Sequence, residues 1–248
     1  MIKYSEENKI GILTLNRPDK RNALHPELVN QFKLKLSEIN TDDIKAFIIT
    51  GEGKSFCAGA DLEYLNQLRV FNSIENEKDS ESLAELFLKI YEFPLPTIAA
   101  VNGAAIAGGC GLASVCDFIV ADKTNAKFGY SEVKIGFIPA IVSIFLIKKI
   151  GEGKAKQLLL SGDIIDSQKA FEAGLADILS DNVLEDAKSL AAKLAQNSGL
   201  SMKFSKKMIS DISNLNVKEA VDYCIRLNVI SRSTEDFKKG LENFLLKK

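Results

Sequence analysis

The strongest constraint on the fold is an alternation of strand-like and helix-like segments along the first three quarters of the chain. Residues 26–39 carry Leu28, Phe32 and Leu36 at helical spacing, which predicts an amphipathic helix. From residue 140 onward the pattern is largely helical. An α/β domain followed by helices is the expected class. Apolar runs that predict strands occupy residues 9–15, 44–50, 97–101 and 116–121.

Composition excludes several kinds of chemistry. The 248 residues include a single histidine, His25, so one chain cannot build a multi-histidine metal site, and a Ser-His-Asp triad would need that residue. His25 precedes Pro26 at an expected helix start, where a solvated turn residue is favoured over a catalytic base. We therefore expect no metal, and a site built from carboxylates, lysines or backbone groups.

Charge and hydropathy limit which binding partners and which cellular location are expected. Lys and Arg total 32 and Asp and Glu total 33, and this net charge of -1 argues against nucleic-acid binding. Four scattered cysteines do not make a disulfide framework. The first residues do not have the pattern of a signal peptide, and no apolar stretch is long enough to predict a membrane span. A cytoplasmic location is expected.

Two segments rich in small residues stand out, at residues 56–62 and 101–112. Each follows an apolar strand and leads into a helix, so small side chains there would let a ligand approach the backbone closely. Backbone N–H groups at a helix start are free to bind an anion, and two of them can form an oxyanion hole. Tight packing between strand and helix explains the same composition equally well.

Two other motifs are weaker. Residues 51–55 read Gly-Glu-Gly-Lys-Ser, but the phosphate-loop spacing would need a glycine where Ile48 stands. Residues 129–133 look like half of a nucleophile elbow without its last glycine, so Ser131 is interpreted as a turn residue. The most polar stretch, residues 72–82, is expected to be a mobile loop at the edge of a site.

The two small-residue segments carry a family resemblance. Ala58-Gly59-Ala60-Asp61 in the first, and an Asn-Gly-x-Ala-x-x-Gly-Gly pattern at residues 102–109 in the second, resemble the crotonase (enoyl-CoA hydratase/isomerase) superfamily. The resemblance covers nearly the whole chain. It continues through Cys116-Asp117, Ala126-Lys127-Phe128-Gly129, Glu132, Gly136, Pro139, residues 160–163, residues 173–175 and the tail at 234–244.

The resemblance implies a fold, an assembly and a set of catalytic groups. The expected fold is a spiral of ββα units in residues 1–198, with a helical trimerisation region in residues 199–248 and a homotrimer or dimer of trimers as the assembly. The backbone N–H groups of Ala60 and Gly108 would bind the thioester oxygen, and Glu132 would act as general acid/base. A partly buried carboxyl at Glu132 would have a raised pKa.

Hydratases of this family commonly carry a second glutamate, but its position here is Gly111. The block at residues 128–140 resembles methylglutaconyl-CoA-hydratase-type sequences, which favours hydration of a 2-enoyl-CoA thioester. Moving a double bond needs only one base, so a 3,2-enoyl-CoA isomerase is the alternative. A third hypothesis is that the protein is a non-catalytic family member that binds acyl-CoA or RNA.

The same resemblance predicts the binding residues for an acyl-CoA thioester substrate, with no cofactor beyond its CoA moiety. Lys54 is a weaker candidate for a phosphate contact than Lys247, which would reach a neighbouring subunit. The predicted CoA contacts are Ala58, Ala60, Asp61, Leu62 and Lys247. The predicted acyl-pocket residues are Tyr64, Leu65, Leu83, Phe87, Tyr130 and Ile141.

Overall fold

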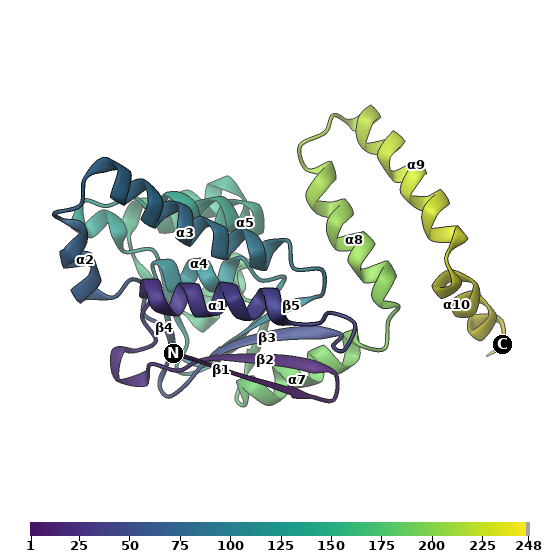
Figure 1. Ribbon diagram of the computed structural model, residues 1–248, viewed down its shortest axis with the longest axis horizontal. Helices are drawn as coiled ribbons and strands as arrows, with labels where there is room; N and C mark the ends of the chain where they lie inside the picture. The colour runs from purple at the N-terminus through teal and green to yellow at the C-terminus, as the bar shows by residue number, and fades with distance from the viewer. Residues whose placement is uncertain (247–248) are drawn as a thin grey trace.

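The computed structural model describes residues 1–246 and has a mixed α/β fold. In Figure 1 the strands lie in the core with helices packed around them, and α8, α9 and α10 stand to one side. The strands are β1 (Ile2–Glu7), β2 (Ile10–Leu15), β3 (Ala46–Gly51), β4 (Ser55–Cys57), β5 (Thr97–Val101), β6 (Ala104–Ile106), β7 (Phe118–Asp122), β8 (Lys127–Gly129), β9 (Ile164–Asp166) and β10 (Ile178–Ser180).

Helices connect these strands and form the whole C-terminal part of the described chain. The α-helices are α1 (Pro26–Glu38), α2 (Leu62–Leu68), α3 (Ser73–Tyr91), α4 (Gly108–Ser114), α5 (Ala140–Ser161), α6 (Ser167–Ala173), α7 (Val183–Leu194), α8 (Gly199–Ile212), α9 (Val217–Ser233) and α10 (Glu235–Leu246). Two short 3-10 helices are η1 (Pro18–Lys20) and η2 (Glu132–Ile135).

The larger sheet has the strand order β1-β2-β3-β5-β7-β10. Only the β1–β2 pair is antiparallel, while β2, β3, β5, β7 and β10 run parallel. Every residue of β3 and β5 is buried. Both faces of this sheet are covered, which explains why its central strands are continuous apolar runs in the sequence.

Two cores hold the larger sheet. On one face, Val183, Ala187 and Ala191 of α7 pack on residues such as Ile48 of β3. On the other face, α1, α3, α4 and α5 enclose a larger core that contains Phe32. Fully burying one such side chain contributes about 1.5–3 kcal/mol, so these two cores supply most of the apolar stabilisation.

A second, smaller sheet has the order β4-β6-β8-β9, with three residues in each strand. Strands β4, β6 and β8 are parallel neighbours. Parallel neighbours end at the same edge of a sheet, so the segments that follow these three strands leave the sheet side by side. This edge brings together the two small-residue segments and the segment that contains Glu132.

Two local features differ in how well the sequence predicted them. The prediction of a mobile loop at residues 72–82 is wrong: residues 73–82 belong to α3, and Asn72 caps its start in a capping box with Glu75. The stretch is polar because that part of the helix faces solvent. The Gly-Glu-Gly-Lys sequence at residues 151–154 predicts a turn that joins two helices, and the structure confirms it, since Gly151 has φ 77° and separates two helical segments within α5.

The C-terminal helices touch the core through α8. The ammonium group of Lys206 donates to Asp117 Oδ2 at 2.6 Å and to the carbonyl oxygen of Leu95 at 3.1 Å. Helices α9 and α10 project away from both sheets (Figure 1). Among residues 1–246, no helix combines the length and the apolar character that crossing a membrane requires.

Candidate active site

Three predicted catalytic positions follow three adjacent strands of the smaller sheet. Ala60 lies three residues beyond β4, Gly108 begins α4 just after β6, and Glu132 begins η2 just after β8. A carbon added to Gly59 would lie 2.8 Å from the carbonyl oxygen of Ile106, so the first two segments touch each other. The sheet topology therefore gathers all three positions at one edge.

The backbone on both sides of Ala60 is tied to Leu24. The N–H of Leu24 donates to the carbonyl oxygen of Gly59 at 2.7 Å, and the N–H of Asp61 donates to the carbonyl oxygen of Leu24 at 2.9 Å. These two bonds form an isolated parallel bridge between Leu24 and Ala60. Within residues 1–246 the N–H of Ala60 itself donates to no backbone acceptor, which leaves it free for a ligand.

Gly108 is the first residue of α4, where backbone N–H groups have no partner inside the helix. The preceding residue, Ala107, has φ 52°, a strained value for a residue with a side chain. Its N–H donates to the carbonyl oxygen of Gly129 at 2.7 Å, which holds the turn against β8. A carbon added to Gly109 would lie 2.0 Å from the carbonyl oxygen of Cys57, so only glycine allows this approach.

Glu132 is a buried acid with an unsatisfied oxygen. Its side chain is 8% exposed, and in the described chain its Oε2 atom is buried without a hydrogen-bond partner. Burial raises the pKa of Glu132, and a hydrogen bond from its own backbone N–H offsets part of this effect. The expected partial burial and raised pKa are confirmed. Such a carboxyl is suited to proton transfer near neutral pH.

Glu132 also lies close to the start of α4. Burial is the main cause that raises the pKa of Cys110 to about 12, and the charge of Glu132 adds to it. Tyr130 is fully buried and its pKa is raised by burial first, with smaller contributions that include Glu132. The Tyr130 hydroxyl lies 2.8 Å from that of Ser114, on the same helix as Gly108. The acid therefore lies beside the helix that provides one predicted oxyanion donor.

Gly111 has no room for a side chain. A carbon added there would lie 2.2 Å from Cγ1 of Val142 and 3.3 Å from Cε1 of Phe87. Val142 is buried on α5, and Phe87 stacks on Phe145 with ring centroids 5.7 Å apart. Apolar side chains thus fill the place in which the resemblance leads one to expect a second glutamate.

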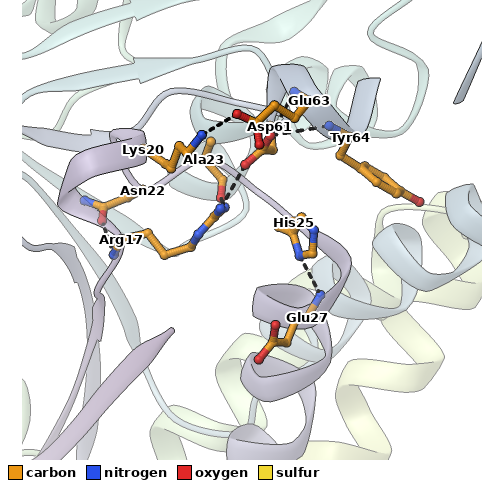
Figure 2. A network of polar contacts seen from close by, with 9 residues as sticks. All are labelled: Arg17, Lys20, Asn22, Ala23, His25, Glu27, Asp61, Glu63 and Tyr64. Carbon is orange, nitrogen blue, oxygen red and sulfur yellow. Dashed lines mark hydrogen bonds and ion pairs between the residues drawn. The ribbon is translucent and has the colours of Figure 1, made fainter. Parts of the chain in front are cut away.

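A polar network flanks the first segment (Figure 2). Arg17 donates from Nη2 to Asp61 Oδ2 at 2.9 Å and from Nη1 to the carbonyl oxygen of Ala23 at 2.8 Å. Asp61 Oδ1 accepts the N–H groups of Glu63 and Tyr64 and caps α2. Burial acts to raise the pKa of Asp61, but Arg17 and the two N–H groups outweigh it and lower that pKa.

His25 has a structural contact in the same view (Figure 2). Its Nδ1 accepts the N–H of Glu27 at 3.3 Å, which caps α1. The ring packs edge-on to Tyr64, with centroids 5.7 Å apart. The sequence placed His25 at a helix start, and the structure confirms this position.

The predicted acyl-pocket residues divide into two groups. Phe87 and Tyr130 are fully buried, and Leu83 and Ile141 pack against the same core. Tyr64 and Leu65 lie half-buried on α2, and the Tyr64 hydroxyl donates to Asp79 of α3 at 2.5 Å. That bond ties α2 to α3.

The predicted CoA contacts differ in exposure. Ala58 and Ala60 are half-buried, whereas the side chain of Leu62 is 73% exposed. Lys54 is exposed, and Lys247 lies outside the described residues. The carboxylate of Asp61 is already bound by Arg17 and by the N-terminus of α2.

A cavity of about 600 Å³ lies between α8 and the core, away from these residues. Its lining includes Tyr91, Asp117, Met202 and Ile209, and none of the predicted site residues. Asp117 Oδ2 is already bound by Lys206 and by the backbone N–H and hydroxyl of Thr97. The cavity is therefore a packing space beneath α8 rather than part of the predicted site.

Comparisons with known proteins agree with this fold. A model of the enoyl-CoA hydratase/isomerase family matches residues 5–248. The chain is 34% identical over 248 residues to the 2,3-dehydroadipyl-CoA hydratase of Escherichia coli, covering 98% of this chain and 95% of the relative. It is 33% identical over 248 residues to the crotonyl-CoA hydratase of Syntrophomonas wolfei, covering 98% and 94%.

Solved structures give the same result. An enoyl-CoA hydratase from Polaromonas sp. JS666 superposes with a TM-score of 0.93 at 31% identity, covering 100% of this chain and 97% of that one. With this match and the full-length family match, the chain belongs to the enoyl-CoA hydratase/isomerase family. The predicted superfamily and the α/β crotonase-like fold are confirmed.

Sequence reasoning missed three residues that shape the site: Arg17, Leu24 and Val142. Arg17 follows the apolar run at residues 9–15, and nothing in the local sequence indicates a partner 44 positions away. Leu24 acts through its backbone, which leaves no sequence signal. Val142 lies in an apolar stretch of the sequence in which no feature distinguishes it from the residues around it. The glycine at position 111 is the one sequence signal that a bulky side chain packs there.

Proposed function

We propose that this protein is an enoyl-CoA hydratase that adds water to a 2-enoyl-CoA thioester. The observation that supports this most is the convergence of Ala60, Gly108 and Glu132 at the edge where β4, β6 and β8 end. Relatives named as hydratases at 33–34% identity over nearly the full chain support the same activity.

The proposed mechanism uses two backbone donors and one acid. As water attacks C3, negative charge develops on the thioester oxygen, where the N–H groups of Ala60 and Gly108 stabilise it. Glu132 takes the proton from the attacking water as the C–O bond forms, and C2 receives a proton from the same carboxyl. Water is thus added across the double bond, and the acid returns to its starting state. No cofactor beyond the CoA moiety takes part.

A 3,2-enoyl-CoA isomerase is the second candidate, and Gly111 favours it. Val142 fills the space beside Gly111, so a second carboxylate has no room there. One base is sufficient to take a proton from C2 of a 3-enoyl thioester and return it to C4, which moves the double bond from C3–C4 to C2–C3. Glu132 satisfies that requirement alone.

The proposed pocket also bears on which acyl group the substrate carries. The predicted pocket residues Tyr64, Leu65, Leu83, Phe87, Tyr130 and Ile141 carry no cation. An uncharged acyl chain suits such a pocket, whereas a methylglutaconyl-like substrate would bring its own carboxylate, which can orient water. Relatives named for crotonyl-CoA and for 2,3-dehydroadipyl-CoA represent both kinds of chain.

The test offers crotonyl-CoA, 3-hexenoyl-CoA and methylglutaconyl-CoA to the purified protein in D₂O. Product formed with water added supports the hydratase, while double-bond movement without water supports the isomerase. Glu132→Gln should reduce turnover by about 10²–10⁴-fold, as loss of a general acid/base does. The exposed Glu77→Gln is the matched control. Tight acyl-CoA binding without turnover of any thioester would favour a non-catalytic role.

A paired substitution separates the two enzyme candidates. Gly111→Glu combined with Val142→Gly supplies a carboxylate and the space it needs. If the natural enzyme is an isomerase limited by this missing group, the pair should gain hydration relative to Val142→Gly alone. An unchanged ratio of hydration to isomerisation would show that Gly111 does not decide the reaction.

We also propose a cytoplasmic location and assembly through the C-terminal helices. Val217, Val221, Ile225 and Val229 recur every four residues on α9 and are exposed in the single chain. A stripe of this kind is suited to burial against another copy. Sedimentation of the wild type and of Val221→Asp tests the proposed trimer or dimer of trimers.

A further inference from the structure

The ion pair between Arg17 and Asp61 is buried beside one predicted oxyanion donor. The side chains are 14% and 4% exposed, and Arg17 Nη2 lies 2.9 Å from Asp61 Oδ2. Asp61 is the residue directly after Ala60. Taking two charges out of water is costly, so a buried pair of this kind needs good geometry and further hydrogen bonds to be tolerated.

Both partners have those further bonds (Figure 2). The second arm of the guanidinium, Nη1, donates to the carbonyl oxygen of Ala23 at 2.8 Å. Asp61 Oδ1 accepts the N–H of Glu63 at 2.9 Å, at the start of α2. Arg17 therefore connects the segment that contains Leu24 with the residue that follows Ala60.

Leu24 contacts the chain around both predicted oxyanion donors, so the position that Arg17 holds affects both of them. Its N–H and carbonyl groups bind the residues on either side of Ala60. Its Cδ1 atom lies 3.0 Å from where a Cβ of Gly108 would stand. A shift of Leu24 would thus move the backbone around Ala60 and the side chain that packs on Gly108.

We propose that Arg17 is a positioning residue for the oxyanion hole, acting through Asp61 and Leu24 on the N–H of Ala60. This inference rests on the proposed function, because it assigns a role within that site. Arg17 touches no reacting atom. The two terminal nitrogens of its guanidinium bind Ala23 and Asp61 at the same time. The single ammonium nitrogen of a lysine does not reproduce this geometry.

The neighbouring pair Lys20–Glu63 provides a matched control. Its atoms lie 2.6 Å apart, it joins the same two regions of the chain, and its side chains are 42% and 77% exposed. Lys20 and Glu63 contact Ala23 and Asp61 only through backbone atoms, which a change of the Lys20 side chain leaves in place. The Lys20 ammonium donates to Glu63. Lys20→Met therefore removes an ion pair between the same segments without releasing the residues beside Ala60.

The experiment compares Arg17→Met, Arg17→Lys and Lys20→Met by steady-state kinetics and by the infrared carbonyl stretch of bound crotonyl-CoA. Hydrogen bonds to the thioester oxygen lower that stretching frequency. Arg17→Met should lose up to about 10²-fold in kcat with little change in KM, since a small misplacement of a catalytic group has effects of that size. Arg17→Lys should restore part of the loss, and Lys20→Met should match the wild type.

The infrared readout separates failure of this inference from failure of the proposed function. If folded Arg17→Met keeps the wild-type kcat and the wild-type frequency, the positioning role is wrong. If the wild type itself shows no lowered frequency and Glu132→Gln keeps full turnover, the proposed site is wrong. Should Arg17→Met not fold, Arg17→Lys alone decides, because the inference requires a lower kcat and a smaller frequency shift in that variant.

Discussion

The two sheets of this protein differ in size, burial and use. The larger sheet has central strands of five or six residues that are buried throughout, and α7 covers one of its faces. The smaller sheet has strands of three residues, and Ala60, Gly108 and Glu132 follow three of them. One sheet therefore supplies most of the apolar burial, while the other supplies a common edge on which separate segments meet.

This division makes stability and chemistry separable. A side chain deep in the larger sheet is remote from the edge that holds Glu132, so its loss should lower stability without changing turnover. A residue that fixes the smaller sheet should change both. The predictions below test this separation in order of decreasing expected effect.

Ile48→Ala should lower the free energy of unfolding by about 2–5 kcal/mol, because Ile48 is fully buried against α7 and its loss leaves a cavity. The kcat of the folded protein should stay within about twofold of the wild type, since additive effects are usual at distant sites. Urea unfolding and turnover measure the two quantities. The half-exposed Leu88→Ala is the control, and a large fall in kcat for Ile48→Ala would argue against the separation.

Gly109→Ala should destabilise the protein by about 1–3 kcal/mol and also reduce turnover. The added carbon would stand 2.0 Å from the carbonyl oxygen of Cys57, which forces the segments after β4 and β6 apart. Gly153→Ala is the control, because nothing lies within 4 Å of a carbon added there. Equal turnover of the two variants would contradict the requirement for close contact between these segments.

Glu132→Gln should make stability less dependent on pH. The pKa of Glu132 is raised in the folded protein, so above the unfolded value of about 4.3 the folded state binds the proton more tightly than the unfolded state. The wild type therefore loses stability as pH rises from that value through the folded pKa. Glutamine does not ionise and so removes this loss, and the variant should be more stable than the wild type near pH 8.

Thermal or urea unfolding at pH 4 and pH 8 measures the effect of Glu132→Gln on stability. The gain should appear at pH 8 and shrink toward pH 4, because the difference in proton binding between the folded and unfolded states disappears as both become protonated. Glu77→Gln, on the exposed face of α3, is the matched control. A gain in Glu132→Gln that does not change with pH would contradict the assigned direction of the pKa.

Ala107→Gly should change stability by less than about 1 kcal/mol. Glycine relieves the strain of φ 52°, but it also gains freedom in the unfolded chain, and the two effects nearly cancel. Ala104→Gly in β6, which has no positive φ to relieve, should lose about 0.5–1 kcal/mol. Urea unfolding compares the pair. Equal losses would show that Ala107 is not strained.

The sequence predicted the larger sheet better than the smaller one, for a physical reason. The runs at 44–50, 97–101 and 116–121 correspond to β3, β5 and β7, because burial on both faces requires unbroken apolar residues. The polar edge strand β1 and the three-residue strands were not predicted. Exposed or very short strands do not show the hydrophobic pattern by which a strand is recognised in a sequence. Asn72 and Glu75 did signal a capped helix within the segment taken for a loop.

The site was predicted by resemblance more than by pattern. The residues alone indicated that the segments at 56–62 and 101–112 approach a ligand, but tight packing explained them equally. In the structure Gly109 packs on Cys57, and Gly108 is the first residue of α4, where a backbone N–H has no partner inside the helix. The contacts of Arg17 and Val142 depend on partners far along the chain, so local patterns carry no trace of them.

The proposed oxyanion donors belong to the main chain, and this has an evolutionary consequence. No codon change at position 60 or 108, except to proline, deletes a backbone N–H group. Glu132 is the single side chain of the proposed machinery, so one codon controls the proton transfer. A descendant of this protein that loses Glu132 would keep both backbone donors. A single mutation could therefore produce a protein that binds acyl-CoA thioesters without catalysing a reaction.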